Sequence, residues 1–282
     1  MRFVVVGASG MLGQDLVPLL ERSGEDVVAL GRTDLDITDL GAVRAAVQGA
    51  DVVVNCAAYT AVDAAETAEA AAFAVNATGA ANVARAAHEH GARTVQVSTD
   101  YVFDGVASEP YAEDAPAAPA SAYGRTKAAG EWAVRAEAPD HLVVRTAWLY
   151  GAHGPCFPRT IARVAAERGG LDVVDDQVGQ PTWTVDLADL VLRLVRAGAP
   201  AGTYHGTASG RTSWHGFAGA VVGAAGLDPA IVRPTTSDAY VRPAPRPAFS
   251  VLGHSALHAI GIEPIGDWRA RWDVASAGVL GA

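Results

Sequence analysis

The 282-residue chain lacks several features that mark particular classes of protein. Half of its residues are hydrophobic, yet no apolar run reaches the ~18 residues that a transmembrane helix requires. The apolar N-terminal segment is interrupted by Gly7 and is too short for a signal peptide. The two cysteines, Cys56 and Cys156, have neither metal-site nor disulfide-framework spacing. These absences predict a cytoplasmic protein in a reducing compartment, without membrane association.

Positive charge is also scarce. Lysine and arginine number 21 against 31 aspartates and glutamates, which gives a formal net charge of −10. An acidic chain of this kind argues against a general nucleic-acid surface. An anionic ligand would therefore depend on local arginines or backbone N–H groups. The eight histidines form no pair with convincing metal-ligand spacing, so no metal site is predicted. Among the 21 cationic residues only Lys127 is a lysine.

The N-terminal segment predicts a nucleotide site. A short apolar run, 2–6, precedes Gly7-Ala-Ser-Gly10-Met-Leu-Gly13, and a helical pattern follows. In a strand–turn–helix unit Gly7 would permit the tight turn, Gly10 the approach of a pyrophosphate, and Gly13 close helix–strand packing. The phosphate would then lie at the helix N-terminus, where N–H groups lack partners.

The cofactor's adenosine end is expected after the second strand, 26–30. An acidic residue that holds the ribose 2′-hydroxyl is usual there, but this chain has Arg32. A guanidinium suits a 2′-phosphate, so NADPH is favoured over NADH. Asp34 and Asp36 follow closely and leave NADH open as an alternative.

Strands and helices alternate through the first half of the chain. Further strands are expected at 51–55, 93–97 and 141–146, with one long helix over 67–90 in which Asn76 would need a hydrogen-bond partner. The alternation predicts an α/β fold with a Rossmann-type, doubly wound parallel sheet. We assign residues 1–150 to an NAD(P)-binding domain and 151–282 mainly to a smaller α/β substrate-binding region, and the chain is allowed to cross between the two.

The central motif is Ser121-Ala-Tyr123-Gly-Arg-Thr-Lys127. Ser121 is a favourable N-cap, and four-residue spacing places Tyr123 and Lys127 on one helix face. A nearby ammonium lowers the pKa of a phenol from about 10, and such a tyrosine can transfer a proton to a ketone or alcohol oxygen. Thr99 follows the fourth strand and would bring a hydroxyl to the same sheet edge. Tyr-x-x-x-Lys alone is a weak pattern, but together with Thr99 and the glycine turn it predicts an oxidoreductase.

Two residues of the second half are candidates for substrate contact. Trp148 suits a nucleobase, a sugar or the core, and sequence alone favours the core. Arg246, in a segment rich in proline and arginine, is the better of the cations there for an anionic nucleotide.

At this point the chain resembles the extended short-chain dehydrogenases/reductases, and more narrowly the dTDP-4-dehydrorhamnose reductases. The resemblance covers nearly the whole chain. Ala147, Pro155 and Phe249 depart from the usual blocks and affect the sugar assignment more than the reaction class. The matching blocks are 7–13, 55–66, 98–105, 123–127, 145–151, 176–182 and 246–250.

The resemblance implies NAD(P)H-dependent reduction of the 4-keto group of a dTDP-4-keto-6-deoxyhexose. Tyr123 would donate the proton, Lys127 would hold the nicotinamide ribose, and Thr99 would hydrogen-bond the ketone. Asp100 and Trp148 would contact the substrate. Some family members place magnesium at a dimer contact, but no ligands are identified here; a homodimer is compatible with the resemblance. The implied cofactor contacts are Gly10, Met11, Leu12, Asp36, Ile37, Ala57, Ala58 and Tyr59.

Three alternatives stay open. A sugar-nucleotide dehydratase or epimerase is disfavoured because dehydratases need a glutamate after the Thr-Asp pair, where this chain has Tyr101. A 4-ketoreductase for another dTDP-deoxysugar of a secreted glycoside would use the same motifs. A non-catalytic nucleotide-binding subunit, similar to the regulatory subunit of methionine adenosyltransferase, is disfavoured by the intact Thr99, Tyr123 and Lys127.

Overall fold

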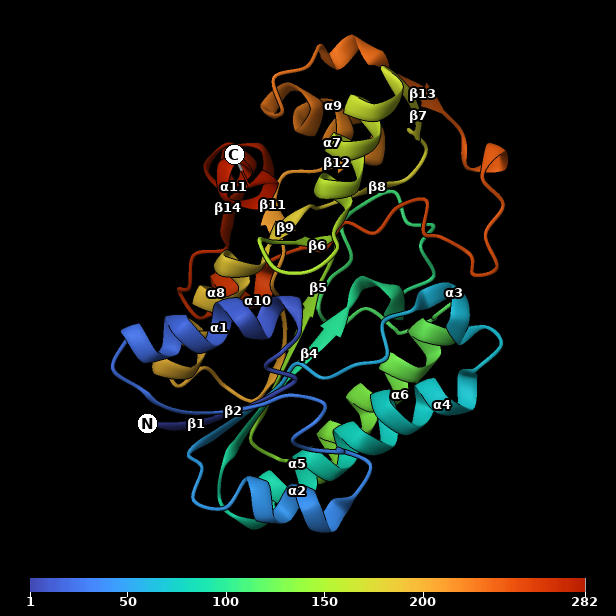
Figure 1. Ribbon diagram of the computed structural model, residues 1–282. Coiled ribbons are helices and arrows are strands. Elements are labelled where there is room, and N and C mark those ends of the chain that lie inside the picture. The colour runs from blue at the N-terminus through green and yellow to red at the C-terminus, as the bar shows by residue number, and fades with distance from the viewer. Residues whose placement is uncertain (282) are drawn as a thin grey trace.

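A six-stranded parallel sheet lies at the centre of the structure, a computed structural model that describes residues 1–281 (Figure 1). The strand order is β10-β5-β4-β3-β1-β2, and every neighbouring pair is parallel. This confirms the α/β, Rossmann-type prediction. The strands are β1 (Arg2–Val6), β2 (Asp26–Leu30), β3 (Val52–Asn55), β4 (Arg93–Thr99), β5 (His141–Thr146) and β10 (Gly202–His205).

Helices cover both faces of this sheet, which explains why its strands are nearly all apolar. Alternate residues of β1 enter opposite cores: Phe3 and Val5 face one, Val4 and Val6 the other. The first face carries α1 (Met11–Arg22), α8 (Thr184–Arg196) and α10 (Ser255–Ala259). The other carries α2 (Leu40–Ala46), α5 (Ala80–Glu89) and α6 (Ala122–Glu137).

The strand order reverses beside β1, which pairs with β2 on one side and β3 on the other. Ligands of open α/β sheets bind outside the carboxyl ends of the strands at such a point. Gly7 follows β1 and Cys56 follows β3, so the predicted glycine turn and residues 56–59 meet there.

The single helix predicted over 67–90 is wrong in detail. The short helix α3 (Val62–Ala65) precedes the segment, which itself contains α4 (Glu69–Phe73), a π-helical stretch (Ala74–Gly79) and then α5. The π-helical stretch holds Asn76, which does find partners, and lies against α6 so closely that a Cβ on Gly130 would come within 2.1 Å of the Asn76 carbonyl oxygen. Contact with α6 thus accompanies the departure from a regular α-helix.

A second lobe lies above the carboxyl edge of the sheet (Figure 1). Its core packs Tyr150, Phe217 and Trp272 together. Its helices are α7 (Phe157–Arg168), α9 (Trp214–Ala224) and α11 (Trp268–Leu280), with 3₁₀ turns at Pro229–Ile231 and Ser237–Ala239. Its paired strands are β6 (Leu149–Tyr150) with β9 (Thr182–Trp183), β7 (Leu171–Val174) with β13 (Val232–Thr235), β8 (Val178–Gly179) with β12 (Thr212–Ser213), and β11 (Ala208–Ser209) with β14 (Ile265–Asp267).

The chain crosses between the two parts more than once. After α7 it returns to the central sheet, where α8 packs on α1 and β10 pairs with β5, before re-entering the second lobe at α9. Residues 1–150 therefore form only the first, continuous part of the nucleotide-binding unit, to which α8 and β10 also belong. Within residues 1–281, no helix has the length and apolarity needed to cross a bilayer.

Candidate active site

The glycine turn between β1 and α1 fits a bound pyrophosphate. Gly7 has φ +80°, and a Cβ there would lie 2.6 Å from the Ala57 nitrogen; a Cβ on Gly13 would lie 2.5 Å from the Ala8 Cα. Both glycines are therefore required by packing. Gly10 is exposed, its only near neighbour is the Gly7 carbonyl oxygen, and no side chain caps the N-terminus of α1. An uncapped helix N-terminus with open access is suited to a phosphate.

The adenosine side of this turn presents Arg32 in an exposed loop after β2. Asp36 accepts hydrogen bonds from the Thr38 N–H and hydroxyl, at 2.9 and 2.8 Å. These bonds, with a smaller effect of Arg32, hold the pKa of Asp36 below its usual value. Asp36 thus orders its own loop, and the exposed Arg32 guanidinium lies close enough to affect its pKa.

The opposite wall of this site is formed by residues 57–59. Asn76 accepts a hydrogen bond from the Tyr59 N–H at 2.8 Å and donates to the Tyr59 carbonyl oxygen at 3.2 Å and to the Thr126 hydroxyl at 3.0 Å. It therefore joins this wall to α6. Ile37 is buried against Gly79, while Met11, Ala57, Ala58 and Tyr59 are partly exposed and Leu12 is buried.

Helix α6 brings Tyr123 to the carboxyl end of β4. The Ser121 hydroxyl accepts the Gly124 N–H at 3.1 Å, which confirms Ser121 as the N-cap. A Cβ on Gly124 would lie 2.2 Å from the Tyr101 carbonyl oxygen, so glycine after Tyr123 permits the close approach of the helix. The Tyr123 ring contacts Tyr101 edge-on at 5.6 Å, and its hydroxyl interacts with Thr99. The structure thus brings Thr99 and Tyr123 together.

The expectation that Lys127 lowers the pKa of Tyr123 is wrong for this structure. Burial raises the pKa of Tyr123 to about 12, the Thr99 side chain partly opposes that rise, and Asp100 adds to it. The Lys127 ammonium instead donates to the Val97 carbonyl oxygen at 2.7 Å, beneath the sheet edge. Tyr123 is therefore fully protonated near neutral pH, the form that donates a proton.

Lys127 itself is 4% exposed, and burial lowers its pKa to about 8, against an opposing effect of Glu131. Cys56, the residue that follows β3, lies near Lys127 and stays a neutral thiol because burial raises its pKa to about 12. The charge of Lys127 is thus sensitive to pH in the mildly alkaline range.

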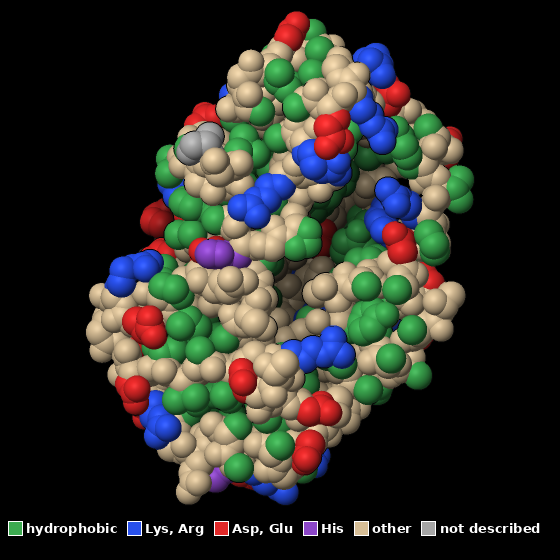
Figure 2. Space-filling model, viewed as in Figure 1, with side chains coloured by type: hydrophobic (Ala, Val, Ile, Leu, Met, Phe, Trp, Pro, Cys, Tyr) green, Lys and Arg blue, Asp and Glu red, His purple; other side chains and the backbone are tan. Residues whose placement is uncertain are grey.

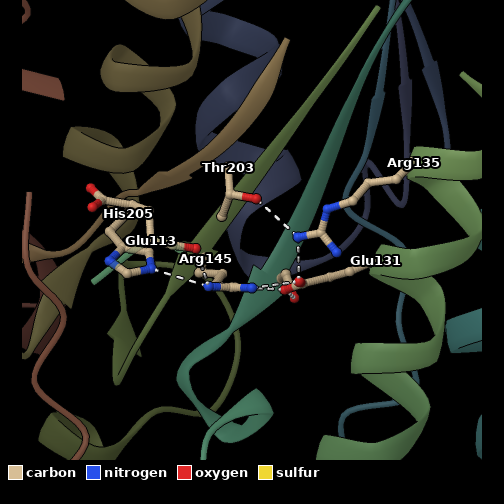
Figure 3. Close-up of polar contacts among 7 residues, drawn as sticks. Glu113, Glu131, Arg135, Arg145, Thr203 and His205 are labelled. Atoms are coloured by element: carbon tan, nitrogen blue, oxygen red, sulfur yellow. Dashed lines mark hydrogen bonds and ion pairs between the residues drawn. The ribbon is translucent and has the colours of Figure 1, made fainter. Parts of the chain in front are cut away.

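One turn beyond Lys127, Glu131 anchors α6 to the sheet (Figure 3). It is 1% exposed and forms a bidentate pair with Arg145 of β5, with N–O distances of 2.9 and 2.8 Å. It also accepts from the Ser98 hydroxyl at 2.6 Å and from Arg135 at 2.9 Å. No local sequence pattern indicates this cluster, because its members come from three separate elements, β4, β5 and α6. A hollow of about 400 Å³ beside Arg135 lies on this side and holds none of the catalytic candidates.

Trp148 does not belong to the core, and that prediction is wrong. It is half-buried, has φ +47°, and its ring stacks on Trp214 with centroids 3.5 Å apart. A Cβ on Gly179 would meet the indole at 2.5 Å. Within residues 1–281 no other non-glycine residue has positive φ, and such backbones cluster at functional sites. Trp214 escaped sequence analysis because it is more than sixty residues away from Trp148 along the chain.

Arg246 lies in the C-terminal segment, between β13 and α10. It pairs with Asp63 of α3 at 2.8 Å and lines a cavity of about 290 Å³ together with Tyr101 and Ser121. Figure 2 shows the surface hollowed between the two lobes, with basic side chains on both sides. Asp100, by contrast, is 3% exposed and does not reach the surface of this hollow.

No metal cluster accompanies these groups. Within the described residues, 1–281, no three His, Cys, Asp or Glu side chains lie close enough together to hold an ion.

The chain is similar to known proteins over nearly its whole length. Residues 1–277 match the family model described as RmlD substrate binding domain. The chain is 53% identical over 276 residues to a dTDP-4-dehydrorhamnose reductase of Streptomyces griseus, covering 95% of this chain and 91% of that protein. It is 50% identical over 270 residues to a dTDP-4-keto-6-deoxy-D-glucose reductase of Streptomyces niveus, covering 95% and 93%. The crystal structure of dTDP-4-dehydrorhamnose reductase from Bacillus anthracis in complex with NADP superposes with a TM-score of 0.94 at 36% identity, covering 97% and 98% of the two chains.

Proposed function

The chain belongs to the dTDP-4-dehydrorhamnose reductase family, and on this premise we propose that it reduces the 4-keto group of a dTDP-4-keto-6-deoxyhexose with NADPH, most simply dTDP-4-dehydrorhamnose to dTDP-L-rhamnose. The proposal is supported by the Thr99 side chain next to the buried Tyr123, by the buried Lys127 ammonium on the same helix, and by a glycine turn whose open helix N-terminus suits a phosphate. The Bacillus anthracis relative was solved in complex with NADP, and the open approach at Gly10 agrees with that cofactor.

NADPH, when bound, supplies the hydride that reduces the carbonyl carbon. Gly7, Gly10 and Gly13 shape its phosphate site, and Arg32 is the residue suited to its 2′-phosphate. Lys127, whose buried ammonium donates to the Val97 carbonyl oxygen, is the residue proposed to hold the nicotinamide ribose.

Tyr123 acts as the general acid. It carries its proton at neutral pH and transfers that proton to the carbonyl oxygen as negative charge develops there. Thr99, next to the Tyr123 hydroxyl, stabilises the same oxygen by a hydrogen bond.

Substrate recognition is assigned to the second lobe and the segment that follows β13. Trp148 offers an indole, held in a constrained backbone, against which the sugar packs. Arg246 is the cation proposed for the diphosphate; because it pairs with Asp63, the substrate exchanges one anionic partner for another.

The geometry weakens the alternatives. Tyr101 occupies the position where a dehydratase places a glutamate, and its ring packs on Tyr123, so no carboxylate base is available there. A purely regulatory subunit has no need of the Thr99–Tyr123 contact or the buried ammonium. A cytoplasmic location and a homodimer complete the proposal; the two free cysteines agree with a reducing compartment.

The test is product analysis. The protein is incubated with NADPH carrying deuterium at the transferred position, once with dTDP-4-dehydrorhamnose and once with dTDP-4-keto-6-deoxy-D-glucose. We expect deuterium at sugar carbon 4 in the first reaction. Faster transfer to the second substrate would favour the activity named for the Streptomyces niveus relative. Absence of transfer to either sugar would contradict the proposal.

A further inference from the structure

The short strands β8 and β9 are hydrogen-bonded to both segments that carry the substrate candidates of the second lobe. In β9, the Thr182 N–H donates to the Trp148 carbonyl oxygen at 3.2 Å. In β8, the Val178 N–H donates to the Ala248 carbonyl oxygen at 2.9 Å, two residues beyond Arg246. These two strands therefore fix the backbone on either side of the proposed sugar and diphosphate contacts.

Gly179 of β8 leaves room for the Trp148 indole. Its φ is not positive, so its backbone is open to any residue. A Cβ at this position would lie 2.5 Å from Cε2 of the indole, 2.7 Å from Cζ2 and 2.8 Å from Nε1. Because carbon atoms in contact lie about 3.5–4.0 Å apart, an alanine here would displace the ring by roughly 1 Å. The Trp148 side chain is thus what requires a glycine in β8.

Trp214 holds the same indole through its own ring. The two rings are stacked, with centroids 3.5 Å apart and planes inclined by 6°. Trp214 directly follows β12, which pairs with β8 through Thr212 and Gly179, and Phe157 packs against it at 4.4 Å between centroids. Since Trp148 has φ +47°, a conformation rare for residues other than glycine, its side chain depends on these contacts for its place.

We propose that Gly179 and Trp214 are positioning residues, which hold the Trp148 indole where it packs against the sugar ring of the substrate. The inference rests on the proposed reductase function, in which Trp148 contacts a 6-deoxyhexulose. Gly179 acts by leaving space and Trp214 by stacking, and neither has to touch the sugar. The β8–β12 pair thereby serves substrate binding without supplying a polar side chain to it.

The experiment measures kcat and KM for dTDP-4-dehydrorhamnose with saturating NADPH. We expect Gly179→Ala and Trp214→Leu each to raise this KM by about 10-fold, the scale of a small packing change in a binding pocket, with a smaller change in kcat. The inhibition constant of dTDP, which has no sugar, and the affinity for NADPH should stay unchanged. Trp214→Phe keeps a stacking ring and should keep a KM near that of wild type.

Gly219→Ala is the matched control for the added methyl group. Gly219 lies in α9 of the same lobe, and a Cβ there would meet no atom within 4 Å, so this variant should keep the wild-type KM.

A Trp148→Ala background tests whether both residues act through the indole. Without that indole, Gly179→Ala and Trp214→Leu should cause no further rise in KM. Stacked indoles also couple electronically and give a couplet in the circular dichroism spectrum. This couplet should be lost in Trp148→Ala and Trp214→Leu and altered in Gly179→Ala.

An unchanged KM in Trp214→Leu would overturn the proposal, and this variant decides if Gly179→Ala does not fold. A KM that rises equally with and without Trp148 would overturn it too, as would an equal loss of dTDP affinity, which would indicate a general disturbance of the lobe. Failure of the wild type to turn over the sugar would contradict the proposed function instead. The dissociation constants of dTDP-L-rhamnose and dTDP in the same variants would then decide the positioning role.

Discussion

Replacement of Glu131 by alanine should destabilise the fold far more than replacement of Arg135, its partly exposed partner. Glu131 is 1% exposed and Arg145 3%, so Glu131→Ala leaves a guanidinium buried without its counter-ion. Breaking such a pair from one side costs about 3–5 kcal/mol. Arg135, at 32% side-chain exposure, forms an i,i+4 pair with Glu131, and Arg135→Ala should cost only about 0.5 kcal/mol.

The pH dependence of this difference follows from the pKa of Glu131. Burial alone would raise that pKa, but the hydrogen bonds and charge of Arg145 outweigh burial and lower it below its usual 4.5. A lowered pKa gives stability that is present above the unfolded value and is lost as pH falls through the folded value. The difference in unfolding free energy between wild type and Glu131→Ala should therefore be largest near pH 7 and decrease below pH ~4.

Urea unfolding followed by circular dichroism measures these free energies at both pH values. The double variant Glu131→Leu/Arg145→Met should recover part of the loss, because it leaves no uncompensated charge. A Glu131→Ala variant as stable as Arg135→Ala at pH 7, or a loss that does not change with pH, would refute the reasoning.

Three further predictions concern the ligands. Arg32→Ala should weaken NADPH binding more than NADH binding, measured by fluorescence titration; equal losses would show that Arg32 does not read the 2′-phosphate. Arg246→Ala should raise the KM for the dTDP-sugar and leave NADPH affinity unchanged. Asp63→Asn, which frees the Arg246 guanidinium, should not raise this KM. An unchanged KM in Arg246→Ala would show that Arg246 does not bind the substrate. Wild-type kcat/KM for NADPH should fall above pH ~8 as Lys127 loses its proton. This fall should be absent in Lys127→Arg, whose overall activity stays low because a planar guanidinium does not fit the place of an ammonium. A fall that persists in Lys127→Arg would assign the titration to another group.

Local patterns predicted the parts of this molecule that local chemistry determines. The strands β1, β2 and β5 have the predicted bounds, because short runs rich in valine and leucine between turn residues are typical of buried strands. The glycine turn and the Ser121 N-cap could also be predicted, because each depends on only a few adjacent residues.

Contacts between distant segments could not be predicted in the same way. The π-helical stretch around Asn76 accompanies contact with α6, and the stacking of Trp148 on Trp214 joins residues that are more than sixty positions apart in the sequence. The pKa of Tyr123 followed burial, which outweighs any single neighbouring charge and is set by the whole fold. The return of β10 to the main sheet is likewise a matter of topology, and Gly202–His205 has no strong local signal.

The central claim is that Tyr123 gives the proton that completes reduction of a dTDP-linked ketone. Single-turnover oxidation of bound NADPH by dTDP-4-dehydrorhamnose, followed at pH 7 in wild type and Tyr123→Phe, tests it most directly. We predict unchanged NADPH affinity and melting temperature in Tyr123→Phe, with hydride transfer slowed by about 10²–10⁴-fold. Transfer at close to the wild-type rate in a folded, NADPH-bound Tyr123→Phe would contradict the account.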